Sequence, residues 1–426
     1  MGSRIAVIGT GYVGLTTGAC FAHLGHDVVC ADVDEAKIER LRSGEVPILE
    51  AGLEELVREG LRSGRLRFVV GAAGAVRDAE FAYLCVPTPQ GPDGSADLSY
   101  IEAAAREIAP HLPPAAVVVN KSTVPVGSTR FVEQALGRSD VFVVSNPEFL
   151  REGSAVTDFL HPDRVIIGSD DQSAAIRVAA LYLDVPAPLM VTDPASAETI
   201  KYASNAFLAT KLSFVNAIAA VCEAVGADVN DVVLGMGYDK RIGHEFLKPG
   251  PGWGGSCFPK DSRALLYLAK EAGYHFDLLE GVISVNHEQF DRVVAKIRRM
   301  VGTLEGSTVA VWGLTFKANT DDLRESPALE IVGRLLDAGA MVRAYDPTVR
   351  DPLDQLPGLK VCDDPYAACD GADVLAVLTE WDEFKWLDLD KVGEQLRHRQ
   401  VVDGRNLLDR SALARRGFRY EGIGRT

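Results

Sequence analysis

The sequence lacks any regular arrangement of cysteine. Seven cysteines are scattered over 426 residues, and none forms a CxxC pair or a Cys/His pattern with metal-ligand spacing. An odd, irregular set of this kind argues against a disulfide framework and against a zinc site. We therefore expect reduced cysteines, no bound metal and a cytoplasmic location.

Long hydrophobic runs and an excess of basic residues are also missing. No stretch of 18 or more apolar residues is present, so we expect no membrane span. The segment after Met1 has neither a charged leader nor a cleavage signal of the kind found in secretory signal peptides. The net charge is −16, from 44 basic and 60 acidic residues. This balance disfavours nucleic acid and anionic membranes as partners, but local basic clusters and helix N-termini can still bind a small anion.

The composition is that of a globular chain with enough length for about three domain-sized units, since 47% of the 426 residues are hydrophobic and 24% are charged. Short β-branched runs alternate with helical stretches, which predicts parallel strands in doubly wound α/β sheets. In the first part of the chain we expect strands at Ile5–Ile8, Val28–Ala31, Phe81–Cys85, Ala116–Asn120, Val141–Ser145 and Arg164–Ile167. In the last part we expect them at Thr308–Trp312, Met341–Tyr345, Val374–Leu378 and Gln400–Val402.

A long helix is predicted between these two parts, from about Asp193 to Gly226. Asp193 or Thr192 suits the N-cap, and Pro194 suits the first turn. Its apolar residues recur at near-helical spacing, at Ile200, Ala203, Phe207, Leu208, Leu212, Val215, Ala219 and Cys222. We therefore predict two Rossmann-like doubly wound units joined by a helical middle domain, with boundaries at 1–192, 193–300 and 301–426.

The first glycine motif predicts a dinucleotide site. Gly9-Thr10-Gly11-Tyr12-Val13-Gly14 follows the first strand and opens a helix, which is the context that a GxGxxG needs. The glycines allow the tight turn, the approach of a pyrophosphate and close helix–strand packing. Asp32 ends the second strand where a ribose-binding acid is expected, which favours NAD over NADP; Asp34 is the competing choice.

A cysteine stands behind a second glycine pair, in Gly254-Gly255-Ser256-Cys257-Phe258-Pro259-Lys260-Asp261. A helix N-terminus and a nearby cation both favour the nucleophilic thiolate, and Lys260 and Asp261 are three and four residues further on. The plain alternative is a buried structural cysteine. A thiol beside a nicotinamide can trap an aldehyde and pass through a thioester to an acid.

Polar residues that could serve this chemistry follow the central strands. Thr88 and Thr123 lie in stiff, proline-containing loops, and Glu148 follows Val141–Ser145 as a candidate acid, base or water-positioning group. Lys201 and Asn205 share one face of the long helix. Each has a structural alternative: a stiff loop, a solvated carboxylate, or a lysine that snorkels.

The chain resembles the UDP-glucose/GDP-mannose dehydrogenase family over nearly its whole length. The resemblance rests on Gly9–Gly14, Val86-Pro87-Thr88-Pro89, Ser122-Thr123-Val124-Pro125-Val126-Gly127, Asn146-Pro147-Glu148-Phe149-Leu150-Arg151-Glu152-Gly153, Glu198-Thr199-Ile200-Lys201-Tyr202-Ala203-Ser204-Asn205-Ala206, Gly254–Asp261 and Trp312-Gly313-Leu314-Thr315-Phe316-Lys317. It implies four-electron oxidation of a sugar nucleotide by NAD in a homodimer with a UDP-binding C-terminal domain.

The resemblance also implies a role for each site residue. The catalytic set would be Cys257 as nucleophile, Lys201, Asp261 and Asn205, with Glu148 and Thr123 holding the hydrolytic water. The cofactor would meet Gly9, Gly11, Tyr12, Val13, Gly14, Asp32, Lys37, Pro87, Thr88, Thr123, Glu152, Lys260 and Arg324. The substrate would meet Glu148, Phe149, Leu150, Arg151, Glu152, Lys201, Asn205, Phe246, Gly254, Lys317 and Arg405, with Arg241 reaching the neighbouring subunit's substrate.

The substrate expected from this resemblance is UDP-glucose, oxidised to UDP-glucuronate. The segment Phe159–Arg164 and the ending Tyr420–Arg425 favour that branch over GDP-mannose or UDP-N-acetylmannosamine. Two alternatives differ in class: a two-electron alcohol dehydrogenase, which needs no thiol at Cys257, and a non-catalytic sensor that yields no NADH.

Overall fold

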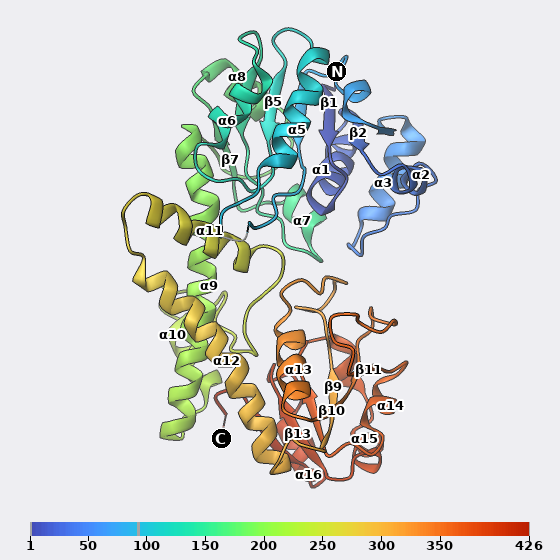
Figure 1. Cartoon of the computed structure of the whole chain (residues 1–426), viewed down its shortest axis with the longest axis vertical. Coiled ribbons are helices and arrows are strands. Elements are labelled where there is room, and N and C mark those ends of the chain that lie inside the picture. Colours follow the sequence, from blue (N-terminus) through green and yellow to red (C-terminus); the bar gives the residue numbers. More distant parts are fainter. Residues whose placement is uncertain (1, 92–93, 426) are drawn as a thin grey trace. The chain divides into compact units, whose positions relative to one another are not determined.

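The computed structural model describes residues 2–91 and 94–425, which form two compact units (Figure 1). The first contains the chain up to Ser204 together with Arg263–Tyr274, and the second contains Asn205–Ser262 together with the chain from His275 on. Each unit is built on one sheet. The predicted fold class is confirmed, while the three predicted domain boundaries stay a prediction.

The sheet of the first unit has eight strands in the order β3-β2-β1-β4-β5-β6-β7-β8. The strand order turns back at β1 and β4, which is the switch point where open α/β sheets bind ligands beyond the carboxyl ends of their strands. The strands are β1 (Arg4–Ile8), β2 (Asp27–Asp32), β3 (Leu66–Val70), β4 (Phe81–Leu84), β5 (Val117–Asn120), β6 (Phe142–Ser145), β7 (Val165–Gly168) and β8 (Leu189–Thr192).

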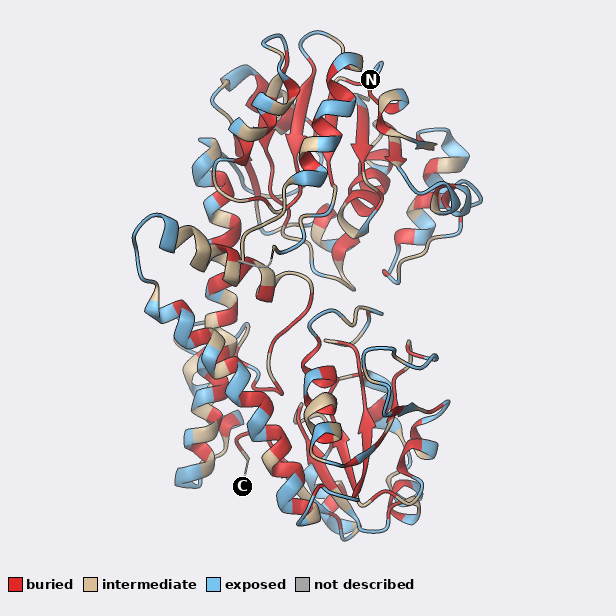
Figure 2. Cartoon of the chain, viewed as in Figure 1, coloured by how far each residue is buried: buried red, intermediate tan, exposed pale blue. Residues whose placement is uncertain are grey.

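Helices cover both faces of this sheet, so its central strands are buried on both sides (Figure 2). Ile5 and Val7 of β1 belong to one apolar cluster, whereas Ala6 and Ile8 belong to the cluster of the opposite face. The helices are α1 (Tyr12–His23), α2 (Glu35–Arg42), α3 (Leu53–Ser63), α4 (Ala72–Ala75), α5 (Ser99–Ile108), α6 (Ser128–Leu136), α7 (Ala155–Leu160) and α8 (Gln172–Ala180).

One strand differs from the prediction of an all-parallel sheet. β7 pairs with β6 in the antiparallel sense, through Ser145 and Gly168. Parallel neighbours need a crossover connection that returns the chain to the same end of the sheet. The connection between β6 and β7 contains only the short helix α7, and the two strands run in opposite directions. The connection begins with the Asn146–Gly153 segment, which carries Glu148.

The second unit has a six-stranded parallel sheet in the order β11-β10-β9-β12-β13-β14, the same order as the first six strands of the first unit. Its strands are β9 (Thr308–Trp312), β10 (Met341–Tyr345), β11 (Leu359–Val361), β12 (Val374–Val377), β13 (Gln400–Asp403) and β14 (Arg419–Gly422). Its helices include α13 (Pro327–Asp337), α14 (Pro365–Cys369), α15 (Leu389–Gln395), α16 (Arg410–Arg415) and the 3-10 turn η2 (Asp382–Trp386).

The two sheets share a turn geometry after their first strand. In the first unit the Gly9 amide donates to the Ala31 carbonyl at 2.8 Å, and in the second the Gly313 amide donates to the Tyr345 carbonyl at 2.8 Å. An aspartate follows each acceptor. Asp346 of the second unit is fully buried and accepts from the Leu314 and Thr315 amides, so it is a structural residue closed to ligands.

Four helices lie in the sequence between the last strand of the first sheet and the first strand of the second. They are α9 (Pro194–Val225), α10 (Val229–Gly237), α11 (Phe258–Glu271) and α12 (Asp277–Val301). Asp193 caps α9 by accepting from the Ser196 amide at 2.8 Å, as predicted. Within the described chain, α9 is also the one helix long and apolar enough to cross a membrane. It nevertheless buries Lys201, Asn205 and Asn216, so we take it as a helix packed within the protein.

Candidate active site

The glycine loop has the geometry that a dinucleotide pyrophosphate requires. Gly9 has φ +96°, and a side chain there would come within 2.6 Å of the Cys85 carbonyl oxygen. A side chain at Gly14 would overlap the Gly9 carbonyl, whereas one at Gly11 would meet nothing within 4 Å. Backbone is therefore packed behind the loop and space is open at Gly11, in front of the N-terminus of α1, so the residues fit NAD.

Asp32 and Asp34 have different contacts. Asp34 caps α2, accepting from the Lys37 amide at 3.0 Å. Asp32 lies against the glycine loop, where its Oδ2 accepts from the Thr10 amide at 2.9 Å and from the Lys37 ammonium at 3.1 Å. Burial opposes ionisation, but hydrogen bonds from Thr10 and the charge of Lys37 lower the pKa of Asp32 to about 2. A ribose hydroxyl would thus meet a carboxylate at Asp32.

A hydrogen-bond network connects the glycine loop to the predicted substrate loop. The Tyr12 hydroxyl donates to the Glu50 carboxylate, and the Gly153 amide donates to Glu50 Oε2 at 2.7 Å. Tyr12 also bonds to the Arg151 carbonyl at 3.1 Å. Burial and the adjacent Glu50 raise the pKa of Tyr12 well above its usual value, so it stays a donor. Glu50 has no motif context, so the sequence alone did not single it out.

The two proline-containing loops lie side by side at the ends of β4 and β5. Thr88 Oγ1 donates to the Thr123 carbonyl at 2.9 Å, and Ser122 Oγ donates to the Val86 carbonyl at 2.7 Å. Glu198 of α9 caps α6 from the far side of this loop, accepting from the Gly127 and Thr129 amides at 2.6 and 2.9 Å. The Thr123 loop is thus anchored on one side to the Thr88 loop and on the other to α9.

Glu148 and Lys201 form an ion pair inside the first unit. Lys201 Nζ lies 2.8 Å from Glu148 Oε1, and each side chain is only 4% exposed. The second oxygen of Glu148 accepts from the Leu150 amide at 2.5 Å. Burying two charges costs desolvation energy, which their attraction and hydrogen bonds offset only in part. A buried ion pair is therefore more typical of a functional site than of a stabilising contact.

The side chains around Glu148 belong to the predicted substrate loop. The ring of Phe149 stacks under the Arg164 guanidinium, 3.9 Å from the ring centroid, and Lys201 Nζ is 5.5 Å from the same centroid. Arg151 forms an ion pair with Asp158 at 2.5 Å. The loop therefore presents an aromatic ring and cations, a set that suits a sugar and a phosphate.

Cys257 lies in the second unit, at the start of α11. Its carbonyl accepts the Asp261 amide at 2.8 Å, which makes it the last residue before the helix, and its side chain is half-buried. Asp261 is fully buried and accepts from Asn205 Nδ2 and from Lys260 Nζ, both at 2.6 Å. Asn205, Lys260 and Asp261 are thus hydrogen-bonded together, about one helical turn after Cys257.

The loop before Cys257 packs closely on its own unit. Gly254 meets the Glu325 backbone so tightly that any side chain would overlap it, and a side chain at Gly255 would come within 2.8 Å of the Phe316 ring. Phe246, a predicted substrate residue, has φ +59°, a strained value for a bulky side chain. Such strain at a predicted ligand contact is typical of binding loops.

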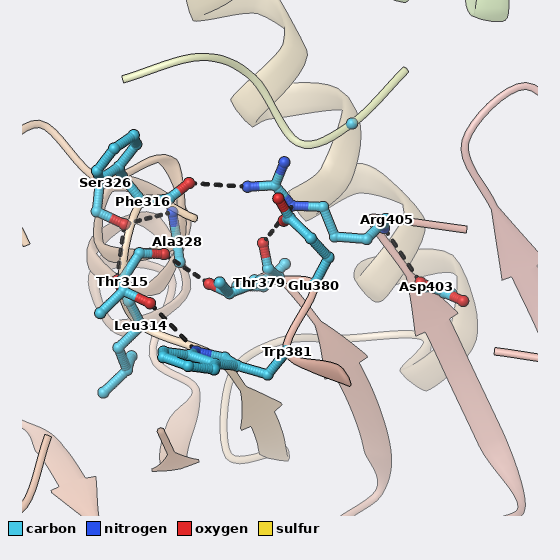
Figure 3. Close-up of polar contacts among 12 residues, drawn as sticks. Leu314, Thr315, Phe316, Ser326, Ala328, Thr379, Glu380, Trp381, Asp403 and Arg405 are labelled. Atoms are coloured by element: carbon cyan, nitrogen blue, oxygen red, sulfur yellow. Dashed lines mark hydrogen bonds and ion pairs between the residues drawn. The ribbon is translucent and has the colours of Figure 1, made fainter. Parts of the chain in front are cut away.

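The predicted nucleotide contacts of the second unit lie around Arg405 (Figure 3). The Arg405 guanidinium donates to the carbonyls of Leu378 and Phe316 at 2.8 and 3.0 Å, and it forms an ion pair with Glu380 at 2.9 Å. Lys317 Nζ is 5.4 Å from the Phe316 ring centroid. Glu380 was not expected from the sequence, because an isolated carboxylate after a strand gives no signal.

Two predicted arginines have partners that are only two residues away. Arg324 forms an ion pair with Asp322 at 2.7 Å, and Arg241 forms one with Asp239 at 2.6 Å. The Arg241 side chain is 89% exposed, so it is available to a molecule outside its own chain. Their roles toward cofactor and substrate stay predictions.

Comparison with known proteins decides the family. The NAD-binding, central and UDP-binding domain models of the UDP-glucose/GDP-mannose dehydrogenase family match residues 3–185, 195–288 and 310–410. The chain belongs to this family. It therefore contains the NAD-binding domain of an NAD-dependent oxidoreductase, which confirms the predicted cofactor and the predicted class of enzyme.

Relatives and solved structures agree over nearly the whole chain. The chain is 47% identical to UDP-glucose 6-dehydrogenase TuaD of Bacillus subtilis, over 99% of this chain and 93% of that one. A UDP-glucose dehydrogenase from Pyrobaculum islandicum is 40% identical, with a TM-score of 0.93 over 100% and 98% of the two chains. A UDP-D-ManNAc dehydrogenase from Pyrococcus horikoshii is 30% identical, with a TM-score of 0.89 over 99% of both.

Proposed function

We propose that this enzyme oxidises UDP-glucose to UDP-glucuronate, with two NAD and one water consumed per product. The observation that carries the substrate is the 47% identity, over 99% of the chain, to a protein named UDP-glucose 6-dehydrogenase. The match to a UDP-D-ManNAc dehydrogenase is weaker, at 30% identity. The family's UDP-binding model over residues 310–410 supports the nucleotide part of the substrate.

The four-electron outcome needs a covalent step, and Cys257 supplies it in our proposal. NAD, when bound, accepts a hydride from the sugar C6 carbon once to give the aldehyde and again to give the acid level. Between these events the Cys257 sulfur forms a bond to the aldehyde carbon, which then becomes a thioester when the second hydride leaves. Water adds to the thioester carbon, the carbon–sulfur bond breaks, and the thiol and the carboxylate are released.

The other residues act on protons and charge in this sequence. Glu148, paired with Lys201, takes the proton of the water that attacks the thioester. Lys201 stabilises the oxyanion that forms on the sugar carbon. Asp261 assists the transfer of the proton that the C6 hydroxyl loses, and Asn205, hydrogen-bonded to Asp261 at 2.6 Å, binds the substrate. The support for these roles is the contacts described and the family resemblance.

The NADH yield at completion tests this function. With limiting UDP-glucose and excess NAD, we expect two NADH per UDP-glucose, and UDP-N-acetylmannosamine and GDP-mannose should give little. One NADH per sugar would mean that the reaction stops at an aldehyde or ketone and that Cys257 is structural. Two NADH from a rival sugar, and none from UDP-glucose, would keep the mechanism and replace the substrate.

A homodimer is part of the proposal, because α9 exposes apolar residues along one face. Phe207, Phe214 and Val221 recur every seven residues and are 65%, 50% and 55% exposed. Leu234 of α10 and Tyr238, which directly follows that helix, are also exposed, at 49% and 72%. A second copy of the chain would cover this surface, which would otherwise face water.

We expect Phe214→Glu to convert the dimer to a monomer, measured by sedimentation or light scattering. Arg241 is proposed to reach the partner's substrate, so the KM for UDP-glucose should rise roughly tenfold in the monomeric Phe214→Glu variant. Arg241→Ala should show the same rise in KM while it stays dimeric. Trp386→Glu, at a site that is 84% exposed in the same unit, is the control and should change neither. An unchanged KM in a dimeric Arg241→Ala protein would contradict the subunit-crossing contact.

A further inference from the structure

Lys121 is a buried lysine that none of the roles above uses. It follows β5 directly, in Asn120-Lys121-Ser122, and is only 5% exposed. Its ammonium donates to Asn146 Oδ1 at 3.1 Å and to the Tyr182 hydroxyl at 3.4 Å. Burying an ammonium costs free energy, and neutral partners offset this cost less well than a carboxylate would. A cation kept under such conditions calls for a reason other than stability.

The partners of Lys121 belong to the segment that carries Glu148. Asn146 is two residues before Glu148, and its side chain is fully engaged: Oδ1 also accepts from Tyr182 at 2.6 Å, and Nδ2 donates to the Ile166 carbonyl at 2.8 Å. Lys121 thereby ties the end of β5 to the start of the segment after β6. The position of the Glu148 backbone depends on this anchor.

Four titratable groups of the first unit face Lys121. Glu148 attracts it, Lys201 of α9 repels it, and Cys85 after β4 and Tyr182 after α8 complete the set. Burial and Lys201 lower the pKa of Lys121 to about 8, while Glu148 acts to raise it. Glu148 thus has one ammonium, that of Lys201, at 2.8 Å, and it also attracts the ammonium of Lys121.

We propose that Lys121 is a positioning residue for the hydrolytic half of the reaction: it anchors the Asn146–Glu148 turn and places a second cation behind the Glu148 carboxylate. This inference rests on the proposed function only for the step that Glu148 serves. The second cation matters when Lys201 turns toward the oxyanion of the substrate, because Glu148 then loses part of its compensating charge. Lys121 then still attracts the Glu148 carboxylate, which accepts the water proton.

The test measures the titration of Glu148 directly, in the full chain. With the glutamate side-chain carboxyls labelled with carbon-13, the Glu148 resonance is assigned by its loss in Glu148→Gln and followed against pH. In Lys121→Met, which keeps an unbranched side chain of similar length and removes the charge, we expect the Glu148 pKa to rise by about one unit. The acid limb of kcat should move up by the same amount, so that activity on that limb falls about tenfold, with KM values changed less than twofold.

Two variants separate this role from packing alone. Lys296→Met removes another buried ammonium, 4% exposed and paired with Glu223 in the second unit, and should lower stability without moving the Glu148 titration. Lys121→Arg keeps a cation and should leave the titration in place. Should Lys121→Met fail to fold, Lys121→Gln keeps a donor for Asn146 and is expected to show the same rise.

An unchanged Glu148 titration in folded Lys121→Met or Lys121→Gln protein would overturn the proposal. This result is independent of the substrate, because the titration needs neither NAD nor sugar. A yield of one NADH per UDP-glucose in the wild type would sink the proposed function, but the titration would still decide whether Lys121 controls Glu148. The two failures are therefore distinguishable.

Discussion

Cys257→Ser is expected to form no UDP-glucuronate, with kcat for acid formation lower by three orders of magnitude or more, on the order of what loss of a nucleophile costs. A serine hydroxyl at the start of α11 is far less ionised than a thiol, so neither the thiohemiacetal nor the thioester forms. Binding of UDP-glucose should stay within about twofold of wild type, because the substitution replaces one atom. Product analysis and equilibrium binding measure the two quantities separately.

The other cysteines provide the control for this variant. Of the seven free cysteines, Cys257 is the one that is half-buried, and the other six are buried. An alkylating reagent should therefore modify about one thiol per native chain, with loss of activity, and Cys257→Ser protein should take up none. Cys362→Ser, in the second unit but outside the candidate site, should keep full activity. Full two-NADH turnover by Cys257→Ser would exclude the covalent route.

The predicted strands were found where a strand is covered on both sides. Each of the ten expected strands is present to within about a residue or two at either end, and the four that sequence reasoning missed are β3, β8, β11 and β14. These four are the edge strands of the two sheets. An edge strand needs no continuous apolar run, as Arg419–Gly422 shows, so the pattern that predicts buried parallel strands cannot detect it.

For the long helix α9, the sequence predicted the ends but not which faces are buried. Its apolar stripe is only partly buried, at Val215, Ala219 and Cys222. In the structure Phe207 is 65% exposed, whereas Glu198, Lys201 and Asn205 are buried. Hydrophobic periodicity finds a helix but does not say which surface covers each face. Here polar residues face the protein interior because they have partners there, and apolar residues such as Phe207 are left exposed.

The site residues with a motif around them could be predicted, and their partners could not. Asp32 was expected from its distance to the glycine motif, and its contact with Thr10 agrees with that expectation. Glu198 was named only as the first residue of a family motif, yet it caps α6. Glu50 and Lys121 act through contacts with residues that are far away in sequence. Such contacts depend on strand order and on the antiparallel β7, which local sequence patterns do not specify.

Glu148→Gln is expected to stall the enzyme after both hydride transfers. The amide has the size of the carboxylate and can still accept from Lys201 through its oxygen, but it cannot take a proton from water. The first turnover should therefore release two NADH per active site in a burst, followed by turnover that is slower by roughly 10²- to 10⁴-fold. Rapid mixing measures the burst, and intact-mass measurement of the quenched protein should find the sugar nucleotide attached to the chain.

The matched control is Glu223→Gln, which removes the carboxylate of another ion pair with a buried lysine, Lys296, at 2.6 Å. Glu223 lies on the same helix as Lys201 but outside the candidate site, so this variant should lose stability without a burst. The Glu148→Gln adduct should disappear when Cys257→Ser is added, because the acyl group then has no sulfur to occupy. Slow linear NADH production from the first turnover, without an adduct, would move Glu148 to an earlier step. Wild-type turnover by Glu148→Gln would show that the carboxylate has no part in the mechanism. The roles proposed for Lys201 and Lys121 toward it would then fail as well.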